Sequence, residues 1–314
     1  MKKTQLKGVL ILLLTAFIWG SSFAAQSIGM ENVPAFTFNG IRTLMGAAVL
    51  LPYILIRDAV QNKKLSPDQI RQKKLENKKI LLPGAILGVI LCVAGNLQQA
   101  AFPYTSSGKI AFITAFYMIF VPVFGLVIGK RVQWPTWICV LLGIAGLYCL
   151  CIGPNGFTGV NKGDLLSFFC SMGFAVHILA IEKFIGRGDA IRMSCVQFLV
   201  SGTITVILMF IFERPDPSAI RAAILPLLYS GVLSCGLAYT FQIVGQKYTE
   251  STVASLLMCM ESVFGVLTGA VVLHERLTGV EIIGCAVMFA AMILSQFSEQ
   301  IVSGLRRRGS ACTG

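Results

Sequence analysis

The sequence predicts an all-α integral membrane protein with ten transmembrane helices, arranged as two inverted repeats of five helices each. Three observations lead to this prediction: apolar segments of membrane length, an internal repeat, and positive charges gathered on one side of the predicted spans. Of the 314 residues, 55% are hydrophobic and only 13% are charged, and the mean hydropathy is +0.78. Soluble domains carry roughly 25% charged residues, so this composition indicates a chain that lies mostly in lipid.

Ten segments are apolar and long enough to cross a hydrocarbon core of about 30 Å, which takes roughly 20 helical residues. They are 7–26, 34–56, 80–101, 106–129, 134–152, 163–183, 190–212, 221–241, 251–273 and 278–298. We expect 1–153 to form the first five-helix repeat, 160–298 the second, and 299–314 a cytoplasmic tail. In the long connection between the second and third spans, Ser66 and Pro67 predict the start of a polar helix.

The two halves of the chain are related by an internal repeat. In the clearest pair of segments, matching residues are separated by one constant offset: Pro83, Gly88, Val89, Cys92 and Gln99 correspond to Pro226, Gly231, Val232, Cys235 and Gln242. Because each half contains an odd number of predicted spans, the second half must enter the membrane in the opposite orientation. Inverted repeats are typical of secondary transporters, whose halves open a site near the membrane midplane to each side in turn.

The basic residues predict the orientation of the chain. With the N-terminus in the cytoplasm, most lysines and arginines fall on the cytoplasmic side, and the outer side receives only Lys162, Arg214, Arg221 and Arg276. The positive-inside rule then places both termini in the cytoplasm. This asymmetry accounts for the net charge of +12, and we expect anionic lipid headgroups as its neighbours and no nucleic-acid partner.

Neither a metal site nor ATP-driven transport is indicated. The ten cysteines include no CxxC spacing, so we expect them to pack as small apolar residues. The chain has no Walker sequence, and we expect no cofactor. An intramembrane enzyme would need a nucleophile and a base at one depth, whereas the two candidates, His177 and Glu261, are expected on opposite sides of the midplane.

Glu261 is the strongest candidate for the chemistry of transport, because it is the only acid near the centre of a predicted span. Ionisable groups at this depth are costly and mark proton relays or substrate sites. We expect Glu261 to couple transport to protons or to bind a substrate amine. The alternative is a structural ion pair with a cation of a neighbouring span, and Arg42 lies closest in depth.

Other polar residues are candidates with two interpretations each. The third and eighth spans carry Asn96, Gln98, Gln99, Tyr239 and Gln242, which must pair with each other or with a ligand. Lys109 either extends to the outer interface or captures an anionic group at the cavity mouth. His177 is either a proton relay or a packing histidine. Trp19 forms either a cavity wall or part of an interfacial belt.

Four short sequences resemble the drug/metabolite transporter superfamily, in its ten-span family with two EamA domains. They are Trp19-Gly20-Ser21-Ser22-Phe23, Gly40-Ile41-Arg42-Thr43-Leu44, Thr114-Ala115-Phe116-Tyr117 with Val121-Pro122, and His274-Glu275-Arg276-Leu277. The resemblance implies a central cavity lined mainly by the first, third, fourth, sixth, eighth and ninth spans, with the fifth and tenth outside. It gives Arg42 and Glu275 structural roles. Two departures from the family pattern leave the substrate class open. The first-half counterpart of Glu275 is Lys130, and Ser262 replaces a proline that is common midway in the ninth span.

Together these observations predict a secondary transporter without enzymatic activity. We expect a multi-pass protein of a bacterial inner membrane that exports small metabolites such as amino acids, by alternating access at a midplane cavity and with proton coupling. Efflux of cationic or aromatic drug-like compounds is the alternative, and a passive channel is a further one. A tenth span that faces outward would also suit a homodimer.

Overall fold

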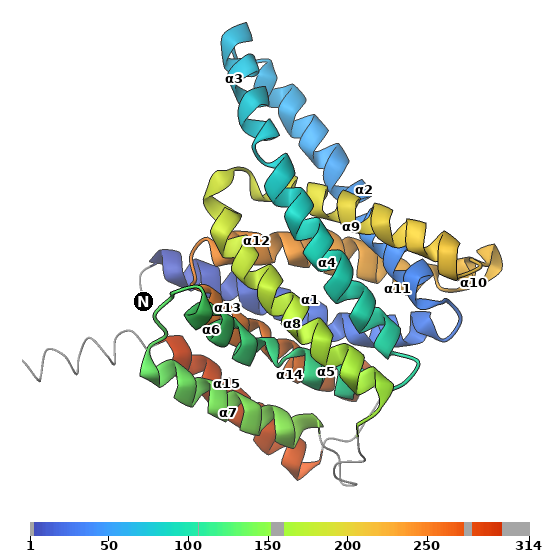
Figure 1. Cartoon of the computed structure of the whole chain (residues 1–314), viewed down its shortest axis with the longest axis vertical. Helices are drawn as coiled ribbons and strands as arrows, with labels where there is room; N and C mark the ends of the chain where they lie inside the picture. Colours follow the sequence, from blue (N-terminus) through green and yellow to red (C-terminus); the bar gives the residue numbers. More distant parts are fainter. Residues whose placement is uncertain (1–2, 106, 152–159, 273–277, 297–314) are drawn as a thin grey trace, which may run out of the picture.

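The computed structural model describes residues 3–105, 107–151, 160–272 and 278–296. These residues form helices and short connections, with no β-strand among them (Figure 1). Within the described ranges, eight helical segments are long and apolar enough to cross a membrane, and two shorter apolar helices accompany them. The all-helical membrane fold is therefore confirmed, whereas the count of ten spans and their inverted arrangement stay predictions.

The helices follow the predicted segments closely. Up to residue 151 they are α1 (Lys3–Met30), α2 (Ala35–Asn62), α3 (Pro67–Lys78), α4 (Leu81–Ala101), α5 (Ser107–Thr114), α6 (Tyr117–Val127) and α7 (Trp134–Cys151). From residue 162 they are α8 (Lys162–Phe184), η1 (Ile185–Arg187), α9 (Ala190–Phe212), α10 (Pro217–Ala222), α11 (Ile224–Leu228), η2 (Tyr229–Tyr239), α12 (Thr240–Gln246), α13 (Ser251–Met258), α14 (Met260–Val272) and α15 (Gly279–Gln296). The predicted fourth and ninth spans are thus each built from two helices, and the eighth from three.

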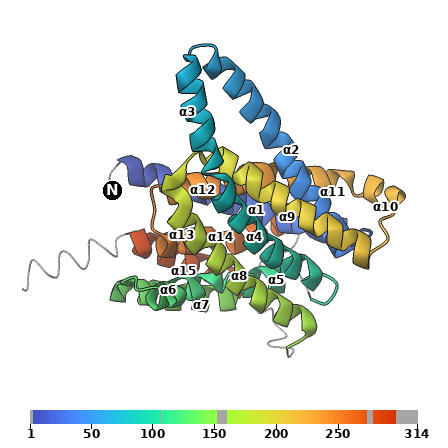
Figure 2. The same ribbon diagram turned by 45° about the horizontal axis from the view of Figure 1, so that its top comes forward.

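The bundle has two ends, which we name after the short helices that mark them. In Figure 1, α3 lies at the top, the start of α1 at the left and α10 at the right; we call the end with α3 and the start of α1 the α3 end, and the end with α10 the α10 end. The 28 residues of α2 reach roughly 42 Å at about 1.5 Å per residue, more than a hydrocarbon core of about 30 Å. Its last turns therefore project with α3 beyond the rest of the bundle (Figure 2). The sequence predicts that the α3 end is cytoplasmic.

The helix α3 begins where the sequence predicts, with Ser66 before the first turn and Pro67 as its first residue. The Gln69 N–H donates to Ser66 Oγ at 3.3 Å, and the Ser66 N–H donates to Gln69 Oε1 at 2.9 Å. These reciprocal bonds satisfy N–H groups that have no partner within the helix. Pro67, at the first helical position, needs no such bond. The predicted helix start is confirmed.

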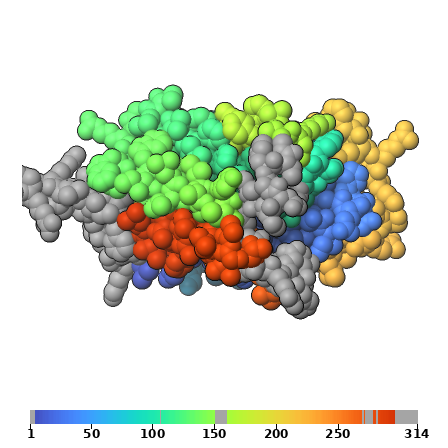
Figure 3. All heavy atoms as spheres, turned by 90° about the horizontal axis from the view of Figure 1, so that it is seen from below, coloured from blue at the N-terminus to red at the C-terminus, as the bar shows by residue number. Residues whose placement is uncertain are grey.

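The helices α7 and α15 pack on each other at one side of the molecule (Figure 3). They approach closely because Gly146 has no side chain: a Cβ there would lie 2.9 Å from the backbone nitrogen of Met288. Their outer faces expose apolar side chains such as Leu141 and Ile283. This peripheral position is the one that the resemblance implies for the fifth and tenth spans.

The helix α1 packs against parts of both the eighth and the ninth predicted spans, namely η2, α12, α13 and α14. Its crossing with α14 is the closest, because Gly20 lies against the backbone of that helix. A Cβ on Gly20 would lie 2.4 Å from the carbonyl oxygen of Glu261 and 2.7 Å from the nitrogen of Gly265. Small residues at such crossings are typical of membrane helices, which associate through close packing.

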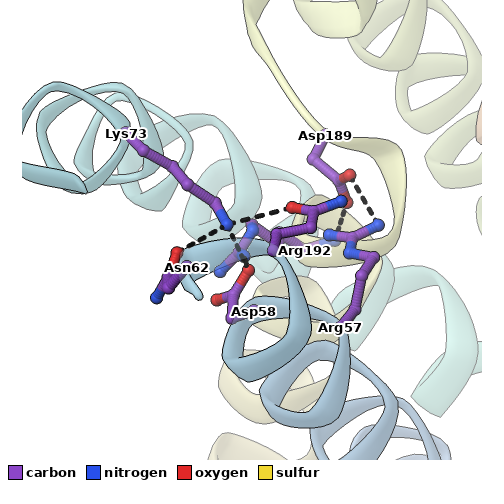
Figure 4. Close-up of polar contacts among 7 residues, drawn as sticks. Arg57, Asp58, Asn62, Lys73, Asp189 and Arg192 are labelled. Atoms are coloured by element: carbon purple, nitrogen blue, oxygen red, sulfur yellow. Dashed lines mark hydrogen bonds and ion pairs between the residues drawn. The ribbon is translucent and has the colours of Figure 1, made fainter. Parts of the chain in front are cut away.

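A network of charged side chains joins α2, α3 and α9 at the α3 end (Figure 4). Arg57 Nη1 lies 2.9 Å from Asp189 Oδ2, and Lys73 Nζ lies 3.1 Å from Asp58 Oδ1. Arg192 pairs with Asp58, and its backbone N–H donates to Asp189 Oδ1 at 2.9 Å. The network holds the projecting hairpin of α2 and α3 to the beginning of α9.

Replacing Asp189 tests this network. Partial burial alone would raise the pKa of the Asp189 carboxyl, but the hydrogen bonds from Arg57 and from the Arg192 N–H outweigh it and hold that pKa below its ordinary value. The ionised carboxylate thus stabilises the fold above the pKa of the unfolded chain, about 4, and this contribution disappears as the pH falls through the lower, folded pKa. We expect Asp189→Asn to cost about 1 kcal/mol at pH 7.

The measurement is thermal unfolding in detergent at neutral and acidic pH. The difference from wild type should shrink as the pH falls below about 4, while Asp68→Asn, on the exposed start of α3, serves as control. Equal stability of Asp189→Asn and wild type at pH 7 would show that the network does not stabilise the fold.

Candidate functional site

Two helix interruptions meet in the middle of the bundle. One separates α5 from α6 at residues 115–116, and the other separates α13 from α14 at Cys259. The Cys259 thiol donates to the carbonyl oxygen of Ala115 at 3.4 Å, so the two interruptions are in direct contact. The repeat that aligns Ser107 with Thr252 places residues 115–116 opposite residues 260–261, next to the interruption at Cys259. Interrupted helices near the midplane form the substrate and ion sites of many secondary transporters.

Glu261 lies directly after one interruption, in the first turn of α14. Tyr117, the first residue of α6, donates its hydroxyl to Glu261 Oε1 at 3.1 Å. Glu261 is buried, with only 4% of its surface exposed. No described residue forms an ion pair with it. The carboxyl therefore sits in the bundle with a neutral hydrogen-bond donor and no direct cationic partner.

The polypeptide also departs from the α-helix in the eighth predicted span, where η2 is a π-helical stretch from Tyr229 to Tyr239. Such stretches are rare and are frequently found at functional sites. The carbonyl of Ser234 accepts a 3.4 Å hydrogen bond from Trp19 Nε1, and the rings of Trp19 and Tyr239 lie 4.7 Å apart. The stretch therefore positions an aromatic pair beside α1.

A cavity lies between these elements. It is lined by Trp19, Phe23, Gln26, Arg42, Gln98, Thr114, Tyr117, Phe174, Ile178, Ser234, Tyr239, Gln242 and Glu261. The space open to the centres of water molecules is about 30 Å³, enough for one or two waters. Side chains thus nearly fill the cavity in this conformation, and a metabolite fits only when the surrounding helices move apart.

Arg42 lies at this cavity together with Glu261, although most of α2 packs on α9 at the side of the bundle. Arg42 Nε donates to Asn39 Oδ1 at 2.9 Å, and only 5% of the residue is exposed. Within the described part of the chain, no ion pair joins Arg42 and Glu261. The structure therefore places an arginine and a glutamate in the lining of one cavity without direct contact between them.

The polar residues predicted on the third and eighth spans are only partly brought together. Gln98, Tyr239 and Gln242 line the cavity. Asn96 is used elsewhere, because its amide bonds to Asn39 at 2.8 Å and to Thr205 at 2.9 Å. Gln99 lies outside the lining and is fully buried, and neither atom of its amide has a partner among the described residues.

Lys109 and His177 also lie outside the cavity lining. Lys109 Nζ pairs with Asp164 Oδ2 at 2.8 Å at the start of α8, so a buried carboxylate that the sequence reasoning missed holds this lysine. His177 Nε2 lies 3.1 Å from Gln197 Oε1. Glu275, with the rest of its sequence pattern, lies outside the described residues.

Several lining residues were not among the predicted site residues. They are Phe23, Gln26, Thr114, Tyr117, Phe174, Ile178 and Ser234. Four had a signal in the sequence: Gln26 occupies the repeat position of His177, and Phe23, Thr114 and Tyr117 belong to the family-like patterns of the first and fourth spans. The others are ordinary apolar or hydroxyl side chains whose facing direction is not visible without the fold.

Ion pairs connect the fourth predicted span to α8 at both ends of the bundle. Lys109 pairs with Asp164 at the α10 end, and Lys130 pairs with Glu182 at the α3 end. Glu182 Oε2 also accepts the backbone N–H of Ser251, the first residue of α13, at 3.3 Å. Both pairs are formed in this structure, one toward each end of α8.

Glu182→Gln is expected to loosen the α3 end. Because the Lys130–Glu182 pair is partly exposed, it contributes up to about 1 kcal/mol, so the open population should rise by up to about fivefold. Hydrogen exchange of the backbone at the start of α13 should then be faster. Asp164→Asn is the matched control, since it should speed exchange in α5 and leave α13 unchanged. Unchanged exchange at α13 in Glu182→Gln would rule out a closing role for this pair.

Comparisons with known proteins agree with the geometry of the fold. Residues 6–152 and 161–297 each match the model of the EamA-like transporter family. An uncharacterized transporter of Archaeoglobus fulgidus is 26% identical over 288 residues, covering 90% of this chain and 83% of the relative. The uncharacterized transporter YoaV of Bacillus subtilis is 21% identical, covering 94% of this chain and 98% of its own.

Two further similarities extend over most of the chain. The uncharacterized inner membrane transporter YedA of Escherichia coli K12 is 24% identical, covering 88% of this chain and 86% of its own. A solved crystal structure superposes with a TM-score of 0.72 at 18% identity, covering 94% of this chain and 98% of that one; at this identity it shows the fold alone. With both halves matched, the chain belongs to the EamA-like transporter family of the drug/metabolite transporter superfamily.

Proposed function

We propose that this protein is a secondary transporter that exports small metabolites such as amino acids, by alternating access at the central cavity. One observation carries the proposal: the interruptions of two spans meet at the cavity, where Tyr117 and Glu261 lie directly after them. Interrupted helices supply free backbone groups and a point of bending at the depth where a substrate binds. The family assignment supports transport in general.

Proton coupling is assigned to Glu261. A carboxyl buried without a cation is costly in its ionised form and can take up or release a proton as its surroundings change. When the cavity opens to one side, water reaches the carboxyl and favours the ion; when it closes, the neutral form is favoured. The hydroxyl of Tyr117 can donate to either form. A proton gradient can therefore drive the cycle through this group.

The two ion pairs on α8 support alternation. Both pairs are formed here, and the cavity between them has room for water only. Opening toward the α3 end requires Lys130 to leave Glu182, and opening toward the α10 end requires Lys109 to leave Asp164. With the α3 end on the cytoplasmic side of a bacterial inner membrane, an exporter binds its substrate from that side and releases it at the α10 end.

The test uses the purified protein in liposomes loaded with a mixed pool of metabolites. Efflux is measured by mass spectrometry with and without an imposed pH gradient, and counterflow is measured with labelled substrate. Gradient-dependent loss of amino acids together with counterflow supports a coupled carrier. Flux without counterflow would indicate a channel, because only a carrier is accelerated by substrate on the far side.

Efflux of cationic aromatic compounds is the second candidate. It is favoured by the aromatic wall of the cavity, which includes Trp19, Tyr239 and Phe174 beside the carboxyl of Glu261. Aromatic faces attract cations within about 6 Å. If the liposomes lose no amino acid faster than protein-free controls but lose aromatic cations, this second function replaces the first.

A further inference from the structure

We propose that Arg42 binds the carboxylate of the substrate, so that Arg42 and Glu261 together select zwitterions with an apolar side chain. This inference deepens the proposed function and rests on it. The sequence pattern suggests a structural role for Arg42. The placement of its side chain at the cavity points to a direct role in recognition.

Arg42 is held in place by a chain of hydrogen bonds across three helices. Thr205 on α9 accepts from Asn96 on α4 at 2.9 Å, Asn96 accepts from Asn39 on α2 at 2.8 Å, and Asn39 accepts from Arg42 Nε at 2.9 Å. All four residues are buried. Such a chain fixes the guanidinium before a ligand arrives, which lowers the entropy lost on binding.

The hydrogen bond to Asn39 uses only Nε of Arg42. No described residue accepts a hydrogen bond from Nη1 or Nη2, or forms an ion pair with them, and the side chain lines the cavity. A planar guanidinium with two free amino groups matches the two oxygens of a carboxylate. A buried charge without a counter-ion is costly, so a carboxylate that enters the cavity offsets a cost already present in the empty protein.

Glu261 supplies a carboxyl group in the same cavity, and a substrate ammonium group that enters favours its ionised form. Its Oε1 accepts from Tyr117, whereas no described residue donates to Oε2. Among the described residues that line the cavity, Arg42 and Glu261 are the only basic and acidic ones. A zwitterion compensates both charges at once, while an amine alone leaves Arg42 without a counter-ion and an acid alone leaves Glu261 without one.

The remaining lining residues decide which side chain the zwitterion carries. Trp19 and Tyr239 form an aromatic pair with ring centres 4.7 Å apart, and Phe23, Phe174 and Ile178 add apolar surface. No further charge is present among the lining residues to meet a charged side chain. The inferred substrate class is therefore the α-amino acids with an apolar or aromatic side chain.

The test compares three ligands that share one aromatic side chain: phenylalanine, which is a zwitterion; phenethylamine, which lacks the carboxylate; and 3-phenylpropionate, which lacks the amine. Binding to the full-length protein in detergent is measured by calorimetry. In wild type, phenylalanine should bind at least about 30-fold more tightly than either analogue, because each analogue leaves one buried charge without its partner.

Variants separate the two charges. Arg42→Gln should lose the preference for phenylalanine over phenethylamine, whereas Glu261→Gln should lose the preference for phenylalanine over 3-phenylpropionate. Arg221→Gln, an arginine on the exposed helix α10, is the matched control and should keep the wild-type order. If Arg42→Gln does not fold, Arg42→Lys keeps the charge without the planar fork and should weaken phenylalanine binding while phenethylamine binding stays constant.

The outcomes distinguish this inference from the proposed transport. Equal binding of phenylalanine and phenethylamine to wild type, or no binding of any of the three, overturns the inference. The inference is supported if wild type prefers phenylalanine over both analogues and Arg42→Gln loses the preference over phenethylamine. This holds even if the liposomes show no counterflow, because the absence of counterflow counts only against the proposed transport. If the liposomes show counterflow of amino acids but Arg42→Gln binds the three ligands with the wild-type order of affinities, the proposed transport is supported and Arg42 does not take part in substrate recognition.

Discussion

Glu261→Gln is expected to abolish the dependence of transport on a proton gradient. The substitution keeps the size of the side chain and an oxygen that accepts from Tyr117, so the contact at the helix interruption persists. It removes the proton that can be taken up and released at the cavity. An imposed pH gradient should then no longer accelerate efflux, and the rate should fall to that of protein-free liposomes.

Glu261→Gln is also expected to lower the affinity of the cavity for a substrate that carries an ammonium group. Truncating one partner of a buried charge pair costs about 2–5 kcal/mol, which corresponds to at least about 30-fold in apparent affinity. Counterflow at saturating substrate separates the two effects, because it needs binding and alternation but no net proton movement. We expect slow counterflow to remain in Glu261→Gln at high substrate concentration.

Two comparisons make this prediction specific. Glu76→Gln, on the exposed polar helix α3, should keep the full gradient dependence. Tyr117→Phe removes the hydroxyl that contacts Glu261 and should shift the pH at which transport is half-maximal while gradient dependence persists. A pH gradient that still drives efflux in Glu261→Gln would mean that another group carries the proton.

Gly20→Ala is expected to have the largest effect on stability. A Cβ at this position would lie 2.4 Å from the backbone oxygen of Glu261 and 2.7 Å from the backbone nitrogen of Gly265. Backbone atoms cannot rotate aside, so α1 and α14 must separate. Forcing extra carbon atoms into a packed contact typically costs about 1–3 kcal/mol. The same separation would move Glu261 away from Tyr117 and slow transport.

Thermal unfolding in detergent and gradient-driven efflux provide the two measurements. Gly108→Ala is the control, because a Cβ there meets no atom within 4 Å, and it should change neither quantity appreciably. A Gly20→Ala protein with the unfolding temperature and transport rate of wild type would show that the crossing is looser than the structure indicates.

Local sequence signals were reliable where the physics is local. Runs of apolar residues set the helices to within a few positions, and Ser66 with Pro67 identified the start of α3. Glu261 was recognised as unusual because an acid in an apolar segment is visible without any partner. The family-like patterns at Trp19 and Tyr117 also fall on cavity residues.

Contacts between distant segments were not accessible in this way. The resemblance gives Arg42 a structural role, and the structure adds that it lines the cavity; the sequence leaves Lys109 at either the interface or the cavity mouth, and the structure adds its ion pair with Asp164. Asn96 was grouped with the cavity amides, yet it bonds to Asn39 and Thr205. Each of these outcomes depends on how far a helix is rotated about its axis, which the hydropathy of a uniformly apolar span does not specify.

The sequence by itself thus determined that the chain is a helical membrane protein, where most of its helices lie, and that Glu261 is exceptional. Hydrophobicity and backbone hydrogen bonding in lipid act residue by residue along the chain and leave few other solutions. Only the tertiary structure decided that α5–α6 and α13–α14 are interrupted where they meet, and that Arg42 and Glu261 share one cavity without touching. Those features depend on side-chain packing between segments more than 100 residues apart, and no local pattern encodes them.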